Sequence, residues 1–182
     1  MTGKAIILRG PPGTGKTQIS QEIVRRFKDG DVQLVNLDRG WGSYPVLEFR
    51  YVGGPGRYAD IHDAAAPILV IELGCGEPPG LEFDGATRAA SEWLDILKNA
   101  GREIHPFLLW AEWSDAVERL TTGWEAYPFD KLFWVWQQLG LRALYENLHP
   151  TASIPQLQET RLVTTGKSVS EATGFVLARS GL

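Results

Sequence analysis

The chain has 182 residues, of which 43% are hydrophobic and 22% charged, and its formal net charge is −4. This length and balance predict one globular domain over residues 1–182, and the negative charge argues against a broad nucleic-acid-binding face. The lone Cys75 excludes an internal disulfide and a cysteine-based zinc site, and the histidines lie too far apart to predict a metal cluster. No apolar run approaches the ~20 residues of a membrane-spanning helix, and no signal peptide precedes the first predicted strand, so we expect a cytoplasmic protein.

The most specific motif is Gly10-Pro11-Pro12-Gly13-Thr14-Gly15-Lys16-Thr17, which satisfies G-x-x-x-x-G-K-[ST]. The apolar run 5–8 before it predicts a buried parallel strand, and the apolar spacing within 18–27 predicts a half-buried helix. A strand, a glycine-rich turn and a helix N-terminus form a phosphate-binding loop (P-loop), because backbone N–H groups and the helix dipole favour a polyanion. We therefore expect Gly10–Thr17 to bind ATP, with Lys16 at the β- and γ-phosphates and the Thr17 hydroxyl as a Mg²⁺ ligand.

Alternating strand and helix patterns continue along the chain. Further strands are predicted at 32–37, 67–73, 104–110 and 161–164. Helices are predicted at 84–99 (closed by Gly101), at 114–120, at 129–148, and from a Ser168–Glu171 capping box to Arg179. Residues 41–63 are irregular apart from a strand-like run at 46–52, and 121–128 has the composition of a flexible connection. Five parallel strands with helices on both faces give a three-layer, doubly wound α/β/α fold, with ligands along the carboxyl ends of the strands.

The amino-acid sequence of the P-loop motif is also typical of the AAA+ ATPases, but other features of the chain differ from that class. Those ATPases carry a helical lid domain, for which this chain is too short, and their third strand ends in Asp-Glu where this chain has Glu72-Leu73. The order of the elements instead resembles the small P-loop kinases: the shikimate and gluconate kinases, chloramphenicol phosphotransferase, zeta toxins and polynucleotide kinases. The resemblance rests on the P-loop, on Asp38, on the strand and helix within 107–120, and on residues 162–172, which are similar to the ending that closes these kinases around the adenine.

The resemblance implies roles for two residues. Asp38, at the tip of the second strand, would accept the proton of the acceptor hydroxyl or hold the metal through water; the alternative is a turn cap beside Arg39. Arg119 would introduce a lid-like segment, 119–142, over ATP, or pair with a carboxylate on its own helix. From its place at the end of the third strand, Glu72 is a candidate for the Mg²⁺ water shell or the acceptor, or for an ordinary ion pair.

Further residues are candidates by position. Lys131 and Arg142 are substitutes for the additional lid arginines that many of these kinases have. Trp41 and Tyr44 are candidates for contact with the acceptor, in an acceptor-side segment that spans 38–66. The tryptophans in the lid half of the chain are expected in the core rather than against a nucleobase.

The leading hypothesis is a kinase that uses ATP and Mg²⁺ to phosphorylate a hydroxyl of a small molecule or nucleotide. One alternative places the acceptor on a polynucleotide, which the acidic charge of the chain disfavours. Another alternative is an ATP-binding NTPase or AAA-type regulatory module that hydrolyses ATP without an acceptor. No membrane partner is expected, and the sequence identifies neither the acceptor nor the nucleobase preference.

Overall fold

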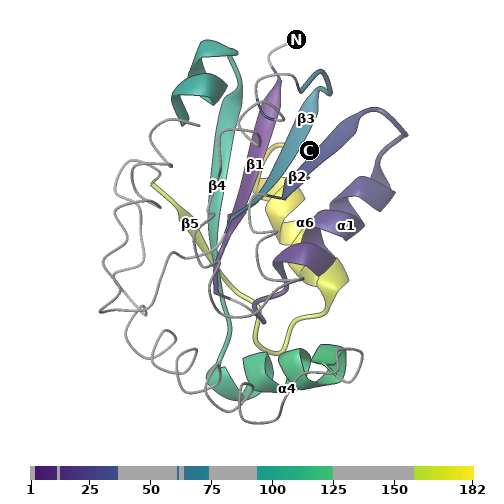
Figure 1. The fold of residues 1–182 in the computed structure, drawn as a ribbon, viewed down its shortest axis with the longest axis vertical. Coiled ribbons are helices and arrows are strands. Elements are labelled where there is room, and N and C mark those ends of the chain that lie inside the picture. The colour runs from purple at the N-terminus through teal and green to yellow at the C-terminus, as the bar shows by residue number, and fades with distance from the viewer. Residues whose placement is uncertain (1–2, 12, 37–60, 62–63, 74–93, 125–157) are drawn as a thin grey trace, which may run out of the picture.

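The computed structural model describes residues 3–11, 13–36, 61, 64–73, 94–124 and 158–182. Its strands are β1 (Lys4–Arg9), β2 (Val32–Asn36), β3 (Ile68–Leu73), β4 (Glu103–Trp110) and β5 (Thr160–Val163). Its helices are α1 (Lys16–Arg26), α4 (Trp113–Trp124) and α6 (Val169–Arg179), and residues 94–99 are also helical. The strands form a five-stranded parallel sheet in the order β2-β3-β1-β4-β5 (Figure 1), which confirms the predicted α/β fold.

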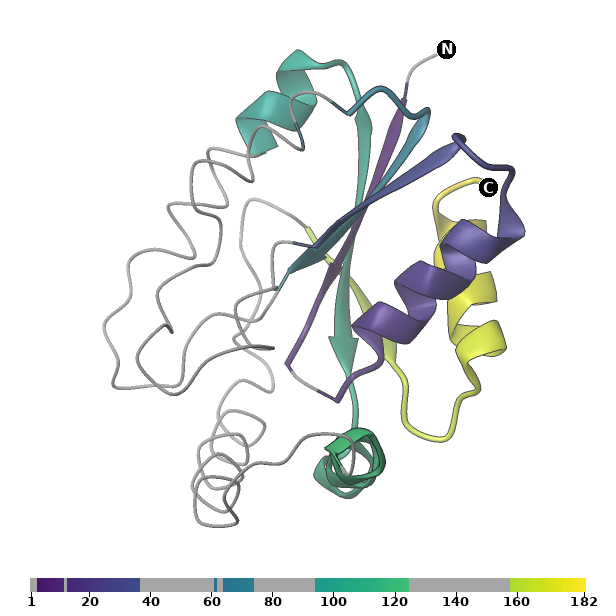
Figure 2. The ribbon, with the colours of Figure 1, turned by 45° about the vertical axis from the view of Figure 1, so that its right-hand side comes forward.

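β1 lies at the centre of the sheet and is apolar on both faces. Ile6 and Leu8 pack into a core that also contains side chains of α1 and α6. Ala5 and Ile7 point to the other face, where they pack against the helical residues 94–99. Figure 2 shows α1 and α6 side by side on one face of the sheet and the segment 94–99 on the other. A strand buried on both faces has a continuous apolar sequence, which is why the run at its centre predicted it correctly.

α4 is longer than predicted. It runs over Trp113–Trp124, so the expected end at Leu120 and the expected flexible connection are wrong for residues 121–124. The sequence contains two opposing signals here. Residues 121–123, Thr-Thr-Gly, are poor helix formers, but Val117, Leu120 and Trp124 keep the apolar spacing of a helix across them. Among the described helices, none has both the length and the apolar character needed to cross a membrane.

The other strands and helices agree with the prediction to within about two residues at the ends that the structure describes. Gly101, with a φ of +68°, ends the helical segment 94–99 as predicted, and the Arg102 N–H donates to the Leu97 carbonyl at 3.1 Å. Several predictions fall wholly or partly outside the described residues: the strand-like run 46–52, most of the acceptor-side segment 38–66, residues 84–93 of the helix 84–99, the helix 129–148 and the lid-like segment beyond residue 124.

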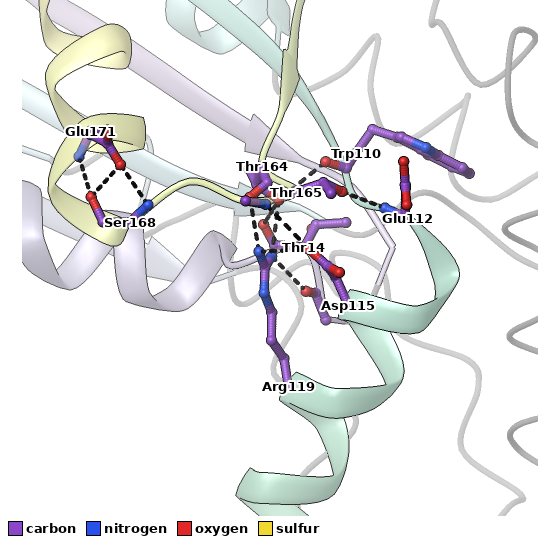
Figure 3. Close-up of polar contacts among 11 residues, drawn as sticks. Thr14, Trp110, Glu112, Asp115, Arg119, Thr164, Thr165, Ser168 and Glu171 are labelled. Carbon is purple, nitrogen blue, oxygen red and sulfur yellow. Dashed lines mark hydrogen bonds and ion pairs between the residues drawn. The ribbon is translucent and has the colours of Figure 1, made fainter.

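α6 begins with the predicted capping box (Figure 3). The Ser168 hydroxyl oxygen accepts a hydrogen bond from the Glu171 backbone N–H at 3.2 Å, and the Ser168 backbone N–H donates to the Glu171 carboxylate at 2.8 Å. These reciprocal bonds satisfy donors that the first turn of a helix leaves open. Hydrogen bonds from Ser168 also stabilise the ionised carboxylate and lower the pKa of Glu171.

Ser168→Ala is expected to lower the free energy of unfolding by about 1 kcal/mol, the typical effect of a lost N-cap. Because the pKa of Glu171 is lower in the folded chain, the stability from this carboxylate is complete above its unfolded pKa and is lost as the pH falls through the folded pKa. The difference in the free energy of unfolding between the wild type and Ser168→Ala, measured with urea, should therefore become smaller in acid. Gln21→Ala, at an exposed position of α1, is the control and should change little. A deficit that stays constant between neutral and acidic pH would contradict this interpretation.

Candidate functional site

The P-loop joins the carboxyl end of β1 to the start of α1, as the sequence predicts. Gly13 and Gly15 have φ values of +84° and +89°, in the left-handed region that glycine adopts most readily. Gly15 is the N-cap of α1 and offers no side chain to accept from the first turn. The N-terminal N–H groups of α1 therefore open onto the loop, where they and the helix dipole favour an anion.

Lys16 is the buried cation of this loop. It is 7% exposed, and its Nζ donates to the Gly10 carbonyl at 2.7 Å and to the Pro11 carbonyl at 3.2 Å. The Thr14 hydroxyl donates to the same Pro11 carbonyl at 2.8 Å. The ammonium group is thus held by backbone carbonyls of the P-loop itself, next to the N-terminus of α1.

The loop passes very close to β4 and α4. A Cβ atom at Gly10 would lie 2.6 Å from the Leu109 carbonyl oxygen, and one at Gly13 would lie 2.9 Å from the Ala116 carbonyl oxygen. Real Cβ atoms essentially never approach other atoms this closely. Glycine at these two positions is therefore required by space, and at Gly13 by backbone conformation as well.

Glu72 lies at the carboxyl end of β3, which is paired with β1, and its side chain meets α1. The Thr17 hydroxyl donates to Glu72 Oε2 at 2.9 Å, and the Ser20 hydroxyl forms a short hydrogen bond with Glu72 Oε1. Glu72 is 1% exposed and Ser20 is fully buried. Ser20 was not among the predicted site residues, although its position one helical turn after Thr17 places both hydroxyls on one face of α1.

Oxygen atoms of Thr17 and Glu72 form a donor set of the kind that Mg²⁺ prefers. In the part of the chain that the structure describes, no cluster of three or more His, Cys, Asp or Glu side chains could hold a metal. Proteins commonly bind Mg²⁺ through one or two carboxylates together with substrate phosphates, rather than in an all-protein cage. The donor set therefore fits a Mg²⁺ ion that is bound together with a nucleotide.

Arg119 of α4 connects the P-loop to the segment that follows β5 (Figure 3). Its guanidinium donates to the Gly13 carbonyl at 3.3 Å, to the Thr164 hydroxyl at 3.0 Å and to the Thr164 carbonyl at 2.8 Å. It also lies 3.9 Å from the Asp115 carboxylate. The structure thus contains the helical ion pair of one predicted alternative, and it also places this arginine directly at the P-loop.

The loop between β5 and α6, residues 164–168, is attached to the same region. The Thr164 hydroxyl lies 3.1 Å from the Thr14 carbonyl and 3.1 Å from the Trp110 carbonyl. The Thr165 hydroxyl oxygen accepts from the Glu112 backbone N–H at 2.7 Å. These contacts bring the C-terminal segment of the chain against the P-loop.

Several predicted site residues lie outside the described residues: Pro12, Asp38, Trp41, Tyr44, Lys131 and Arg142. Their roles remain predictions from the sequence.

One feature near the P-loop was not predicted. Arg9, the last residue of β1, forms a bidentate ion pair with Glu159, with Nε–Oε1 at 2.5 Å and Nη2–Oε2 at 2.6 Å. The two side chains are 3% and 2% exposed. The available sequence signal was the arginine itself, because a charged residue that directly continues a buried apolar strand requires a partner.

Comparison with known proteins places this geometry among P-loop domains. The family described as AAA domain (dynein-related subfamily) matches residues 5–121. The search of curated proteins found no match. The tunicamycin resistance protein of Deinococcus radiodurans is similar in structure, with a TM-score of 0.56 and 18% identity over 99% of this chain and 96% of that one. A gluconokinase from Sinorhizobium meliloti 1021 is similar with a TM-score of 0.50 and 15% identity, over 98% of this chain and 91% of that one.

At these identities the structural likeness shows the fold alone, and that fold is consistent with the predicted small P-loop kinase group. Polyphosphate Kinase 2 from Arthrobacter aurescens TC1 shares it, with a TM-score of 0.51 and 12% identity over 98% of this chain and 66% of that one. The family match runs from β1 into α4 and includes the P-loop and Glu72. The chain length and Glu72-Leu73, which at the level of the sequence argued against the AAA+ ATPases, therefore do not exclude this chain from the AAA domain family.

Gly13→Ala is expected to weaken both the fold and the binding of a non-hydrolysable ATP analogue. Gly30→Ala is the matched control, because Gly30 has nearly the same φ (+87° against +84°) but no atom within 4 Å of the added Cβ. Backbone conformation alone should cost about 1–2 kcal/mol of unfolding free energy in both variants. The clash with Ala116 should cost Gly13→Ala a further ~1–3 kcal/mol. Urea unfolding and calorimetric titration test this, and equal losses in the two variants would show that the close approach is unimportant.

Proposed function

We propose that this chain, which belongs to the AAA domain family (dynein-related subfamily), binds ATP at its P-loop and transfers the γ-phosphate to a hydroxyl of a small molecule or nucleotide. The observation that carries this proposal is the hydrogen bond between Thr17 and Glu72, which lies next to the buried Lys16 of the P-loop at the carboxyl ends of β1 and β3. A buried cation, a hydroxyl and a carboxylate at one place suit the charge of a triphosphate and its metal ion. The likeness of fold to a gluconokinase and a polyphosphate kinase supports phosphoryl transfer.

Thr17 and Glu72 are the residues that would hold Mg²⁺ in this proposal. When bound, Mg²⁺ neutralises phosphate charge and keeps the phosphates in position. Ser20 hydrogen bonds to one oxygen of the Glu72 carboxylate and so directs the other oxygen toward Thr17. A ligand carboxylate is commonly oriented by such a second hydrogen bond.

The remaining roles concern the phosphates and the acceptor. Lys16 would exchange the carbonyls of Gly10 and Pro11 for phosphate oxygens, since an ammonium group binds either kind of oxygen. Arg119 would supply positive charge beside the P-loop, where its guanidinium already contacts Gly13. Asp38, proposed from the sequence alone, would take the proton of the acceptor hydroxyl.

The family match favours a second candidate, an ATPase module that hydrolyses ATP without an acceptor. The two candidates are separated by following ATP in the presence of a panel of sugars, nucleosides and other hydroxyl compounds. If the chain is a kinase, phosphorus NMR should show a phosphate ester of one of these hydroxyl compounds, formed in the same amount as ADP. Steady release of inorganic phosphate that no acceptor diverts would favour the ATPase. Salt-dependent binding of DNA or RNA would instead favour a polynucleotide acceptor.

Asp38→Asn is expected to lower phosphate transfer about 10²–10⁴-fold while it leaves the binding of an ATP analogue unchanged, because general bases contribute this range to a rate. Asp29→Asn, at an exposed position before β2, is the control and should transfer phosphate at the wild-type rate. Transfer by Asp38→Asn at the wild-type rate would show that this carboxylate is not the base.

Glu72→Gln is expected to weaken metal binding about 10–100-fold, the effect seen when a metal site loses a supporting carboxylate. The measurement is a titration of Mn²⁺ followed by electron paramagnetic resonance, with a non-hydrolysable ATP analogue present. Glu22→Gln, which removes an exposed ion pair with Arg26 on the same helix, serves as the control. An unchanged metal affinity in Glu72→Gln would remove Glu72 from the proposed metal site.

A further inference from the structure

Both ends of β5 are tied to the P-loop segment, although β4 lies between β5 and β1. Glu159, which directly precedes β5, pairs with Arg9, the residue before the P-loop. Thr164, which directly follows β5, contacts the carbonyl of Thr14 within the P-loop. In the sheet that the structure describes, β5 is an edge strand of four residues that pairs only with β4. Its position therefore depends strongly on what holds its two ends.

Arg9 is the fixed member of the ion pair. Its backbone lies in the central strand, in register with Leu73 of β3 on one side and Leu108 of β4 on the other. Glu159 stands just outside a short edge strand. The ion pair is therefore one of the contacts that position Glu159, whereas Arg9 is already fixed by its place in the central strand.

The backbone at Gln158, directly before Glu159, has an uncommon conformation. Gln158 has a φ of +48° and is the one non-glycine residue with a positive φ among the described residues. A residue with a Cβ adopts this conformation at a cost, and it persists where the surrounding structure holds it. The ion pair with Glu159 provides such a constraint one residue later.

The pair also favours the observed register of β5 over a register shifted by one residue. Leu162 packs into the core shared with α1 and α6, and by strand alternation Glu159 belongs to the opposite face, where Arg9 lies. A slip of one residue would expose Leu162 and would separate the two buried charges from each other. It would also move Thr164 away from Thr14.

We infer that Arg9 and Glu159 form a positioning pair, which fixes β5 and thereby holds the loop 164–168 against the P-loop. The inference rests on the proposed function, in which the P-loop binds the phosphates, and on the resemblance to the small P-loop kinases, whose similar ending closes around the adenine. The pair acts directly on the loop 164–168, on the nucleoside side of the site, and reaches the phosphates only indirectly, through the bonds between Thr164 and Arg119. It should matter for a ligand with a base and ribose and matter little for a bare triphosphate.

The test uses the double variant Arg9→Met/Glu159→Leu, because replacing both members of a buried pair by apolar residues is often neutral or stabilising, whereas removing one leaves a buried charge. Its stability is measured by urea unfolding. Its affinities for an ATP analogue and for inorganic tripolyphosphate, each with Mg²⁺, are measured by calorimetry. We expect the analogue to bind at least about fivefold more weakly than to the wild type, and tripolyphosphate within about twofold of it. Glu22→Gln/Arg25→Gln, which removes an exposed pair on α1 and keeps the Arg26 side chain that contacts Ser170, is the control.

The outcomes separate the possibilities. Wild-type affinity for both ligands in the double variant would show that the pair only stabilises the fold. Equal weakening of both ligands would show that it acts on the P-loop itself. Either result overturns the inference. If the double variant does not fold, Arg9→Lys replaces it, because this variant keeps the charge but loses the bidentate fork. It should also weaken binding of the ATP analogue more than binding of tripolyphosphate, but by a smaller factor.

A measurement without ligand keeps the inference separate from the proposed function. The Thr164 N–H donates to the Trp110 carbonyl at 2.7 Å, and the Lys167 N–H donates to the Thr164 carbonyl at 3.1 Å. Both amides should exchange hydrogen faster in the variants than in the wild type, while Ile23 in α1 should not change. Unchanged exchange at Thr164 and Lys167 would contradict the positioning role. If the wild type bound neither ligand, the proposed function would fail and this exchange would still decide the role of the pair.

Discussion

The chain must pass from β1 into α1 through Gly10–Gly15 while it lies against the backbones of β4 and α4, and the site depends on this constraint. The close approaches of Gly10 and Gly13 leave no room for side chains, so the loop exposes backbone rather than side-chain groups. Its N–H groups and the start of α1 then attract an anion. Lys16 is drawn into the same space and is held there by carbonyls.

Other groups converge on this loop from both directions in the sheet. On one side, Glu72 reaches Thr17 because β3 is paired with β1. On the other side, β4 and β5 bring Arg119 and Thr164 against the loop. The metal side and the nucleoside side of the proposed site thus belong to different neighbours of β1. We therefore expect a change at Arg9 to weaken the binding of the nucleoside more than the binding of the metal and phosphates.

The elements could be predicted from the sequence where the signal depends on residues close together in the chain. Such signals are the P-loop motif, the apolar run of β1, the capping box at Ser168 and the helix-ending Gly101. The contacts of Ser20 with Glu72 and of Arg9 with Glu159 join residues far apart in the sequence. No local pattern reveals such pairs, since they arise only when the order of the strands is known. Arg9 at the end of an apolar strand indicated that a partner was needed, but not which one.

A crystal structure with Mg²⁺ and a non-hydrolysable ATP analogue tests the central claim most directly. The account predicts that the phosphates lie in Gly10–Thr17, with Lys16 moved from the Gly10 carbonyl to the phosphates and the metal beside Thr17 and Glu72. It also predicts that the base lies against the loop 164–168. A nucleotide bound elsewhere, or a Lys16 that still contacts the Gly10 carbonyl with the analogue present, would contradict the account.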